Sequence, residues 1–312
     1  MIFNKNMSHR VHEIVSVFLL EMQRLLKTWR WGIVFAVIFL VVWQSVSLLL
    51  RYSVVIEARP NIWDAFFSVY GNWSVFILSV VFPLLLFFLL GDIIVRDTQN
   101  GYMQIVLSRL RFRSSWWLGK CLAVISISAI FVGLVLFLSI SVGAARGLPI
   151  EFTTSSLIKF NGYVDPQRMA QFGVNFFVIN PFYVGMNSVL HTLFLICLLT
   201  MSYSMIVLLG VSLGAYAKNV FVPTGIAIFV TQFLSIAGAD AFSSKLFAVG
   251  NVLVTSFQDS AFRIYPGTES ELVPAAKSYI LLTQQETILL NSVLILLFVV
   301  LGGVFLYRKE FK

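Results

Sequence analysis

The chain has 312 residues, of which 59% are hydrophobic and 12% are charged. Soluble domains carry roughly a quarter charged residues, so this composition excludes an ordinary soluble protein and predicts one that lies in lipid. The formal net charge of +8 does not indicate a nucleic-acid partner, because the basic residues gather in loops on one side of the predicted membrane spans.

The first predicted element is an amphipathic helix over residues 8–30. Apolar side chains recur there at intervals of three and four residues, and charged side chains occupy the rest of the helical wheel. A charged helix with an apolar stripe beside a span is expected to lie in the membrane interface. The alternative is a soluble cytoplasmic extension.

Six apolar runs follow, each long enough to approach the roughly 20 residues that a helix needs to cross the hydrocarbon core. Because that core offers the backbone no water, such runs must be helical, which predicts an all-α polytopic membrane protein with a single domain over 1–312. The predicted spans are 31–50, 73–90, 121–142, 189–215, 220–236 and 287–306.

The segment 91–120, between the second and third predicted spans, is the one long polar connection that is clearly basic. Apolar residues inside it have the spacing i, i+3, i+4, i+7, which predicts a short amphipathic helix within 97–113. The stripe consists of Met103, Val106, Leu107 and Leu110, and the candidate N-caps are Asp97, Thr98 and Asn100. We interpret this helix as a docking surface. The alternative is a loop whose basic residues only set the topology.

The same segment resembles the signature region of the permease subunits of ABC-2-type ATP-binding-cassette exporters. The residues that carry the resemblance are Asp92, Asp97, Gly101, the run 105–108, Arg113 and the pair Gly119-Lys120. Three positions depart from the family pattern. Asp97 stands where glutamate is usual, Tyr102 where threonine is usual, and Leu110 where proline is common.

The resemblance implies a coupling helix over 97–113 that contacts a separate cytoplasmic ABC ATPase subunit, and an elbow helix over 8–30. It also implies a second permease copy or a homologous permease as partner. We expect ATP and magnesium to bind in the ATPase and no cofactor to bind in this chain. The expected contact residues are Asp97, Gly101, Arg109, Arg111 and Arg113, because glycine allows close backbone approach and arginine forms forked bonds to carboxylates.

The distribution of the 22 lysines and arginines predicts the topology. Most of them lie near the two termini and in the segment 91–120, so we expect both termini in the cytoplasm and the chain in the plasma membrane. The loops 143–188 and 237–286 are then extracellular. The loop 143–188 is rich in aromatic residues, which predicts that it folds as a small cap over the spans. The second contains either a re-entrant hairpin or an extracellular lid.

Residues with catalytic chemistry are scarce in this sequence. The two cysteines, Cys121 and Cys197, lie in apolar runs, and the three histidines form no metal-binding pattern. The pair Gly119-Lys120 lacks the upstream glycine of a phosphate-binding loop, so we expect no enzyme activity and no ATP site in this chain. The uncharged, aromatic spans suit export of an amphipathic or apolar substrate such as a peptide, lipid or drug. The alternative is a polytopic membrane scaffold or sensor that transports nothing.

Overall fold

The computed structural model of the chain describes residues 2–55, 58–71, 81–153, 155, 187–214, 221–222, 224–227 and 284–309. Every regular element assigned in these residues is a helix, as the all-α prediction requires. The helices are α1 (Ile2–Leu26), α2 (Arg30–Val55), α3 (Ile62–Gly71), α5 (Phe82–Leu90), α6 (Val95–Gln99), α7 (Tyr102–Arg109), α8 (Arg113–Ala145), α12 (Ser188–Gly214) and α17 (Gln284–Lys309).

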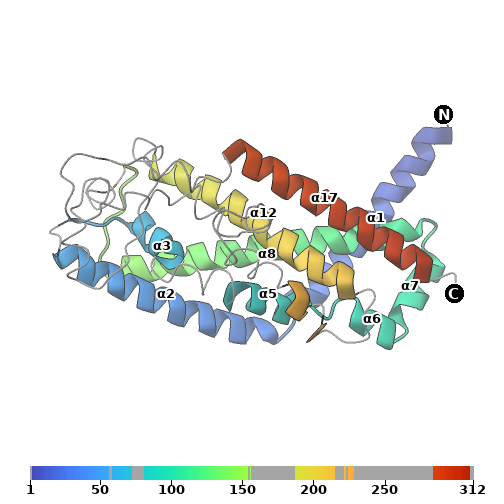
Figure 1. Cartoon of the computed structure of the whole chain (residues 1–312), viewed down its shortest axis with the longest axis horizontal. Helices are drawn as coiled ribbons and strands as arrows, with labels where there is room; N and C mark the ends of the chain where they lie inside the picture. The colour runs from blue at the N-terminus through green and yellow to red at the C-terminus, as the bar shows by residue number, and fades with distance from the viewer. Residues whose placement is uncertain are drawn as a thin grey trace, which may run out of the picture.

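The long helices α2, α8, α12 and α17 run lengthwise and form an elongated bundle (Figure 1). The N-terminus, α6, α7 and the end of α17 lie at one end of this bundle, which we name the α7 end. The short helix α3 and the C-terminus of α8 lie toward the opposite end, which we name the α3 end. The chain therefore brings its two termini and the segment between α5 and α8 to the same end.

Three helices are long and apolar enough to cross a membrane: Arg30–Arg51, Arg113–Ala145 and Ser188–Gly214. They correspond to the first, third and fourth spans predicted from the sequence. The third begins earlier than expected, because Arg113 and the residues after it already belong to α8. The chain thus has the helices of a multi-pass membrane protein.

The other three predicted spans are not shown by the described residues. Of the run 73–90, α5 covers the last part, and of 220–236 the structure describes residues 221–222 and 224–227. Helix α17 covers 287–306, but its apolar stretch within the described residues is Asn291–Val304, which is shorter than a full span. Most of the predicted loops 143–188 and 237–286 lies outside the described residues.

The interior of the bundle is a cluster of aromatic rings contributed by different helices. Phe82 of α5, Phe131 of α8 and Tyr203 of α12 contact one another edge-to-face, with ring centroids 5.5 to 6.4 Å apart. Tyr70 of α3 adds a fourth ring, 5.9 Å from Phe82. Edge-to-face pairs are a favoured packing of aromatic rings, so this cluster fixes how four helices meet.

Helix α1 turns a mixed face to the bundle and an apolar face outward. Val17, Glu21 and Leu25 are buried, whereas Val15 and Leu19 are 43% and 54% exposed. An exposed apolar face is what an interfacial helix offers to lipid. The predicted helix is therefore present, although it ends at Leu26 rather than at residue 30, and its place in the interface stays a prediction.

The prediction of one helix over 97–113 is wrong, because the chain forms two short helices, α6 and α7, on either side of Gly101. Gly101 has φ = 67°, a left-handed conformation that breaks a helix and that glycine adopts without strain. Gly101 is itself the N-cap of α7, so the capping role expected of Asp97, Thr98 or Asn100 is also wrong. The apolar stripe is confirmed: Met103 is buried, and Val106, Leu107 and Leu110 pack against the core.

A capping box starts α3 at the α3 end. The side chain of Asn61 accepts from the backbone N–H of Trp63 and Asp64 at 3.0 and 3.2 Å, and Asp64 Oδ2 accepts from the backbone N–H of Asn61 at 2.8 Å. Such reciprocal bonds satisfy the free N–H groups of a first turn. Asn61 Nδ2 also donates to the Thr153 carbonyl at 2.9 Å, which ties α3 to the segment after α8.

Burial raises the pKa of Asp64 to about 7, although hydrogen bonds from Asn61 and Ser155 oppose the shift. The folded protein then keeps a proton that the unfolded chain, with the ordinary pKa of 3.8, releases. Stability should therefore be greatest below pH 3.8, fall as the pH rises from there to about 7, and level off above it. Asp64→Asn keeps an oxygen for the Asn61 N–H, so it should flatten this dependence. Thermal unfolding midpoints of both proteins between pH 5 and 8 test this, and parallel curves would contradict it.

Candidate functional site

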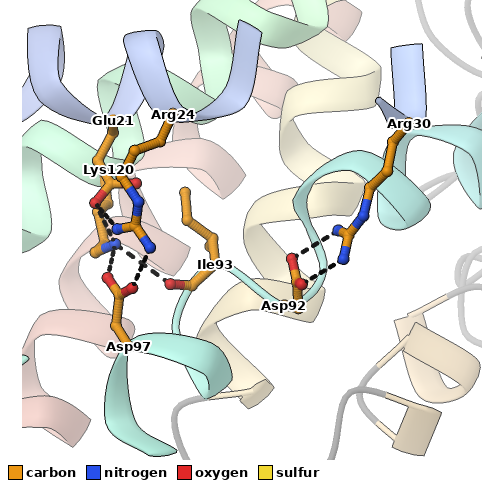
Figure 2. A network of polar contacts seen from close by, with 7 residues as sticks. All are labelled: Glu21, Arg24, Arg30, Asp92, Ile93, Asp97 and Lys120. Carbon is orange, nitrogen blue, oxygen red and sulfur yellow. Dashed lines mark hydrogen bonds and ion pairs between the residues drawn. The ribbon is translucent and has the colours of Figure 1, made fainter. Parts of the chain in front are cut away.

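Four charged side chains from three parts of the chain meet inside the α7 end (Figure 2). Lys120 Nζ, near the start of α8, donates to Glu21 Oε1 of α1 at 2.9 Å and to Asp97 Oδ2 of α6 at 2.5 Å. Arg24, one turn after Glu21, donates to Glu21 Oε1 at 3.1 Å and to Asp97 Oδ1 at 2.9 Å. We call Glu21, Arg24, Asp97 and Lys120 the charge cluster.

The charge cluster is balanced, and Glu21, Asp97 and Lys120 are buried, whereas the side chain of Arg24 is 29% exposed. Two carboxylates face two cations, and the side chains of Lys120 and Asp97 are 0% exposed. Lys120 Nζ also donates to the Ile93 carbonyl at 3.3 Å and lies 4.8 Å from the centre of the Trp116 ring. Because a buried charge without partners is costly, these contacts offset the cost of burying Lys120 among apolar side chains.

Arg24 shows the electrostatic effect of this arrangement. Burial alone would lower its pKa, but the hydrogen bond to Asp97 and the negative charge of Glu21 outweigh burial, so the pKa of Arg24 is raised. Its guanidinium also lies over the Tyr102 ring, 4.7 Å from the centroid. Arg24 therefore stays charged and links α1 to both α6 and α7.

A second ion pair, separate from the charge cluster, attaches the segment between α5 and α6 to α2 (Figure 2). Arg30, the first residue of α2, donates to Asp92 through both terminal nitrogens, at 2.9 and 2.7 Å. One of those nitrogens also donates to the Phe88 carbonyl at 2.9 Å. Two parallel hydrogen bonds of this kind fix both the position and the orientation of the Asp92 carboxylate relative to Arg30. Asp92 is thus attached to α2, and Asp97 is attached to both α1 and α8.

The segment after α7 is attached to α1 as well. Glu13 accepts from the backbone N–H groups of Arg111 and Phe112 at 2.8 and 3.2 Å. Arg10 donates to Ser114 Oγ at 3.1 Å. Helix α7 is therefore held at both of its ends by bonds to the N-terminal helix, and its outer face remains exposed.

The predicted site residues separate into two groups. Asp97 is fully buried and bonds through both oxygens inside the chain. The four others lie at the edge of the α7 end: Gly101 is half-buried, and Arg109, Arg111 and Arg113 are exposed. Arg113 belongs to α8 rather than to the helix predicted over 97–113.

Sequence reasoning missed most of the charge cluster. From the sequence alone, Glu21 and Arg24 belong to the polar face of an amphipathic helix, and Lys120 belongs to a Gly-Lys pair. A signal was present for Lys120, because a lysine within an apolar run needs a buried partner. Nothing local pairs it with Glu21 or Asp97, which lie 99 and 23 residues away along the chain.

The described residues contain no group of three or more His, Cys, Asp or Glu side chains that would hold a metal ion. Lys120, the lysine of the Gly-Lys pair, already donates to two carboxylates and a carbonyl, so it has no capacity left for a phosphate. The charge cluster thus joins α1, α6 and α8 at the α7 end. No protein-family model, no curated protein and no solved structure matches this chain.

Proposed function

We propose that this chain is the membrane permease subunit of an ABC-2-type exporter, driven by a separate cytoplasmic ATPase that docks on α7. The observation that supports this most is the way α7 is mounted. The segment that leads into α7 is fastened to α8 by the buried pair Asp97–Lys120 and to α2 by the partly exposed pair Asp92–Arg30, and both α8 and α2 are long enough to span a membrane.

The docking face consists of residues on the outside of α7 and just beyond it. Ile105 is 54% exposed on the outside of α7. Arg109 and Arg111 lie beside it with exposed side chains. An apolar residue beside arginines suits a protein partner that presents a small pocket and carboxylates.

The charge cluster would carry the movement of α7 into the membrane. A push on α7 reaches α8 through the Asp97–Lys120 pair, α1 through the Asp97–Arg24 pair, and α2 through the Asp92–Arg30 pair. The proposed role of Asp97 is therefore internal transmission rather than direct contact with the ATPase. The substrate would pass between two permease copies, and an amphipathic or apolar compound fits spans that are mainly apolar.

Arg109→Gln tests the docking face, since Arg109 is exposed and α7 does not need its charge to fold. Loss of a charge-assisted bond to the partner, about 1.5–3 kcal/mol, should weaken ATPase association roughly tenfold or more. The readout is the ratio of co-purified ABC ATPase, identified by its Walker A motif, to inserted permease.

Arg51→Gln is the matched control, because Arg51 is an exposed arginine near the opposite end of α2. It should leave the ratio unchanged. If Arg109→Gln retains the ATPase at the wild-type ratio, or if wild type carries no ABC ATPase at all, the docking assignment fails.

A further inference from the structure

Arg146, the residue that follows α8, lies flat on α2 near the α3 end. The guanidinium carbon is 4.0 Å from the centre of the Trp43 indole, close enough for a cation–π contact. Arg146 Nη2 also donates to Ser47 Oγ at 3.4 Å. Two successive turns of α2 thus hold the side chain in one orientation.

The surface around this contact is apolar and exposed. Trp43 is 43% exposed, and its neighbours Phe39 and Leu40 are 38% and 66% exposed on the same helix. All three lie inside the candidate span Arg30–Arg51. Such side chains on a span are expected to meet lipid chains, so Arg146 is a cation at the lipid-facing surface.

The depth of Arg146 follows from the rise of α2. At 1.5 Å per residue, Trp43 lies about 20 Å and Ser47 about 26 Å along the helix from Arg30. A hydrocarbon core is roughly 30 Å thick, so Ser47 lies just below the second interface. The guanidinium, held between Trp43 and Ser47, therefore lies about 4–10 Å inside the core, and a cation at such a depth is tolerated where local thinning of the bilayer brings the headgroups to it.

The guanidinium retains donors for a ligand. Arginine carries five N–H donors, and within the described residues the Arg146 side chain makes one hydrogen bond, to Ser47. No ion pair joins Arg146 to a described carboxylate. An exposed, oriented guanidinium with no counter-ion among the described residues matches the two-pronged geometry of a phosphate.

We propose that Arg146, held by Trp43 and Ser47, binds the phosphate of a phospholipid headgroup in the leaflet at the α3 end. The exposed apolar residues beside it accept the acyl chains, which favours a phospholipid over a free phosphate ion. The site depends on α2 and α8 spanning the membrane and is independent of any ATPase.

The experiment measures binding of phosphatidylglycerol to the detergent-purified chain, by the lipid-dependent rise of the thermal unfolding midpoint and by lipid retention in native mass spectrometry. Arg146→Gln should weaken the apparent affinity roughly tenfold, as expected for loss of a charge-assisted bond. Trp43→Leu keeps the charge but removes the stacking surface, and should weaken binding several-fold. Lys27→Gln, which removes an exposed cation at the α7 end, is the control and should bind as wild type.

Two further probes identify the ligand. A galactolipid without phosphate and inorganic phosphate alone should each give no shift that depends on Arg146. The proposal is overturned if Arg146→Gln and Trp43→Leu bind phosphatidylglycerol like wild type. It is also overturned if the galactolipid is retained equally, or if inorganic phosphate produces the same shift as the phospholipid.

Discussion

Replacing Lys120 by methionine is expected to destabilise the protein by about 3 to 5 kcal/mol, because it leaves two buried carboxylates with one cation. Methionine has a similar length and packs well in apolar surroundings, so the change removes the charge without creating a large cavity. The thermal unfolding midpoint of the purified protein should fall markedly. Lys27→Met is the matched control, since Lys27 is an exposed lysine on the same side of the molecule, just after α1.

A double variant shows whether the charges act as a unit. Asp97→Asn alone should also destabilise the protein, because it leaves Lys120 with one carboxylate partner. Combined with Lys120→Met, it removes one charge of each sign, so the double variant should lose clearly less than the sum of the two single losses. Strictly additive losses, or a Lys120→Met midpoint equal to that of Lys27→Met, would contradict the cluster.

Gly119→Val is expected to force α1 away from α8. A Cβ atom at Gly119 would lie 2.7 Å from Val17 Cγ1 and 3.1 Å from the Ile14 carbonyl oxygen, a clash that includes the backbone of α1. Overpacking of this kind costs about 1–3 kcal/mol, and here it also strains the bonds of Lys120 to Glu21. The thermal unfolding midpoint of Gly119→Val should therefore be lower than that of the wild type.

Gly133 provides the control for that experiment, because it lies on the same helix and an added Cβ would meet no atom within 4 Å. Gly133→Val should therefore be nearly neutral. If both valine variants have the same midpoint, the close approach of α1 to α8 is not a stabilising contact.

Hydropathy alone was sufficient to predict the long helices. A span needs only continuous apolar character over its length, and the runs at 31–50, 121–142 and 189–215 provide it. Boundaries were less accurate, because a helix extends beyond its apolar part wherever polar residues find partners. Helix α8 starts at Arg113 for this reason, with Ser114 and Lys120 bonded to α1.

The charge cluster could not be predicted from the sequence, because its formation depends on how three distant segments pack. The i, i+3 pair Glu21–Arg24 has the same spacing as any solvated surface pair. The helix break at Gly101 left a clearer local signal, since Asn-Gly pairs favour turns. The capping box of α3 was also visible, as an asparagine followed three residues later by an aspartate before apolar residues.

Site-specific photo-crosslinking from α7 in intact membranes tests the proposed function most directly. A photoreactive residue at Ile105, 54% exposed on the proposed docking face, should crosslink to an ABC ATPase chain, identified by mass spectrometry from its Walker A peptide. The same residue at Val54, which is 78% exposed near the other end of the bundle, should give no such product. Absence of the ATPase crosslink at Ile105, or an equal crosslink at Val54, would contradict the permease assignment.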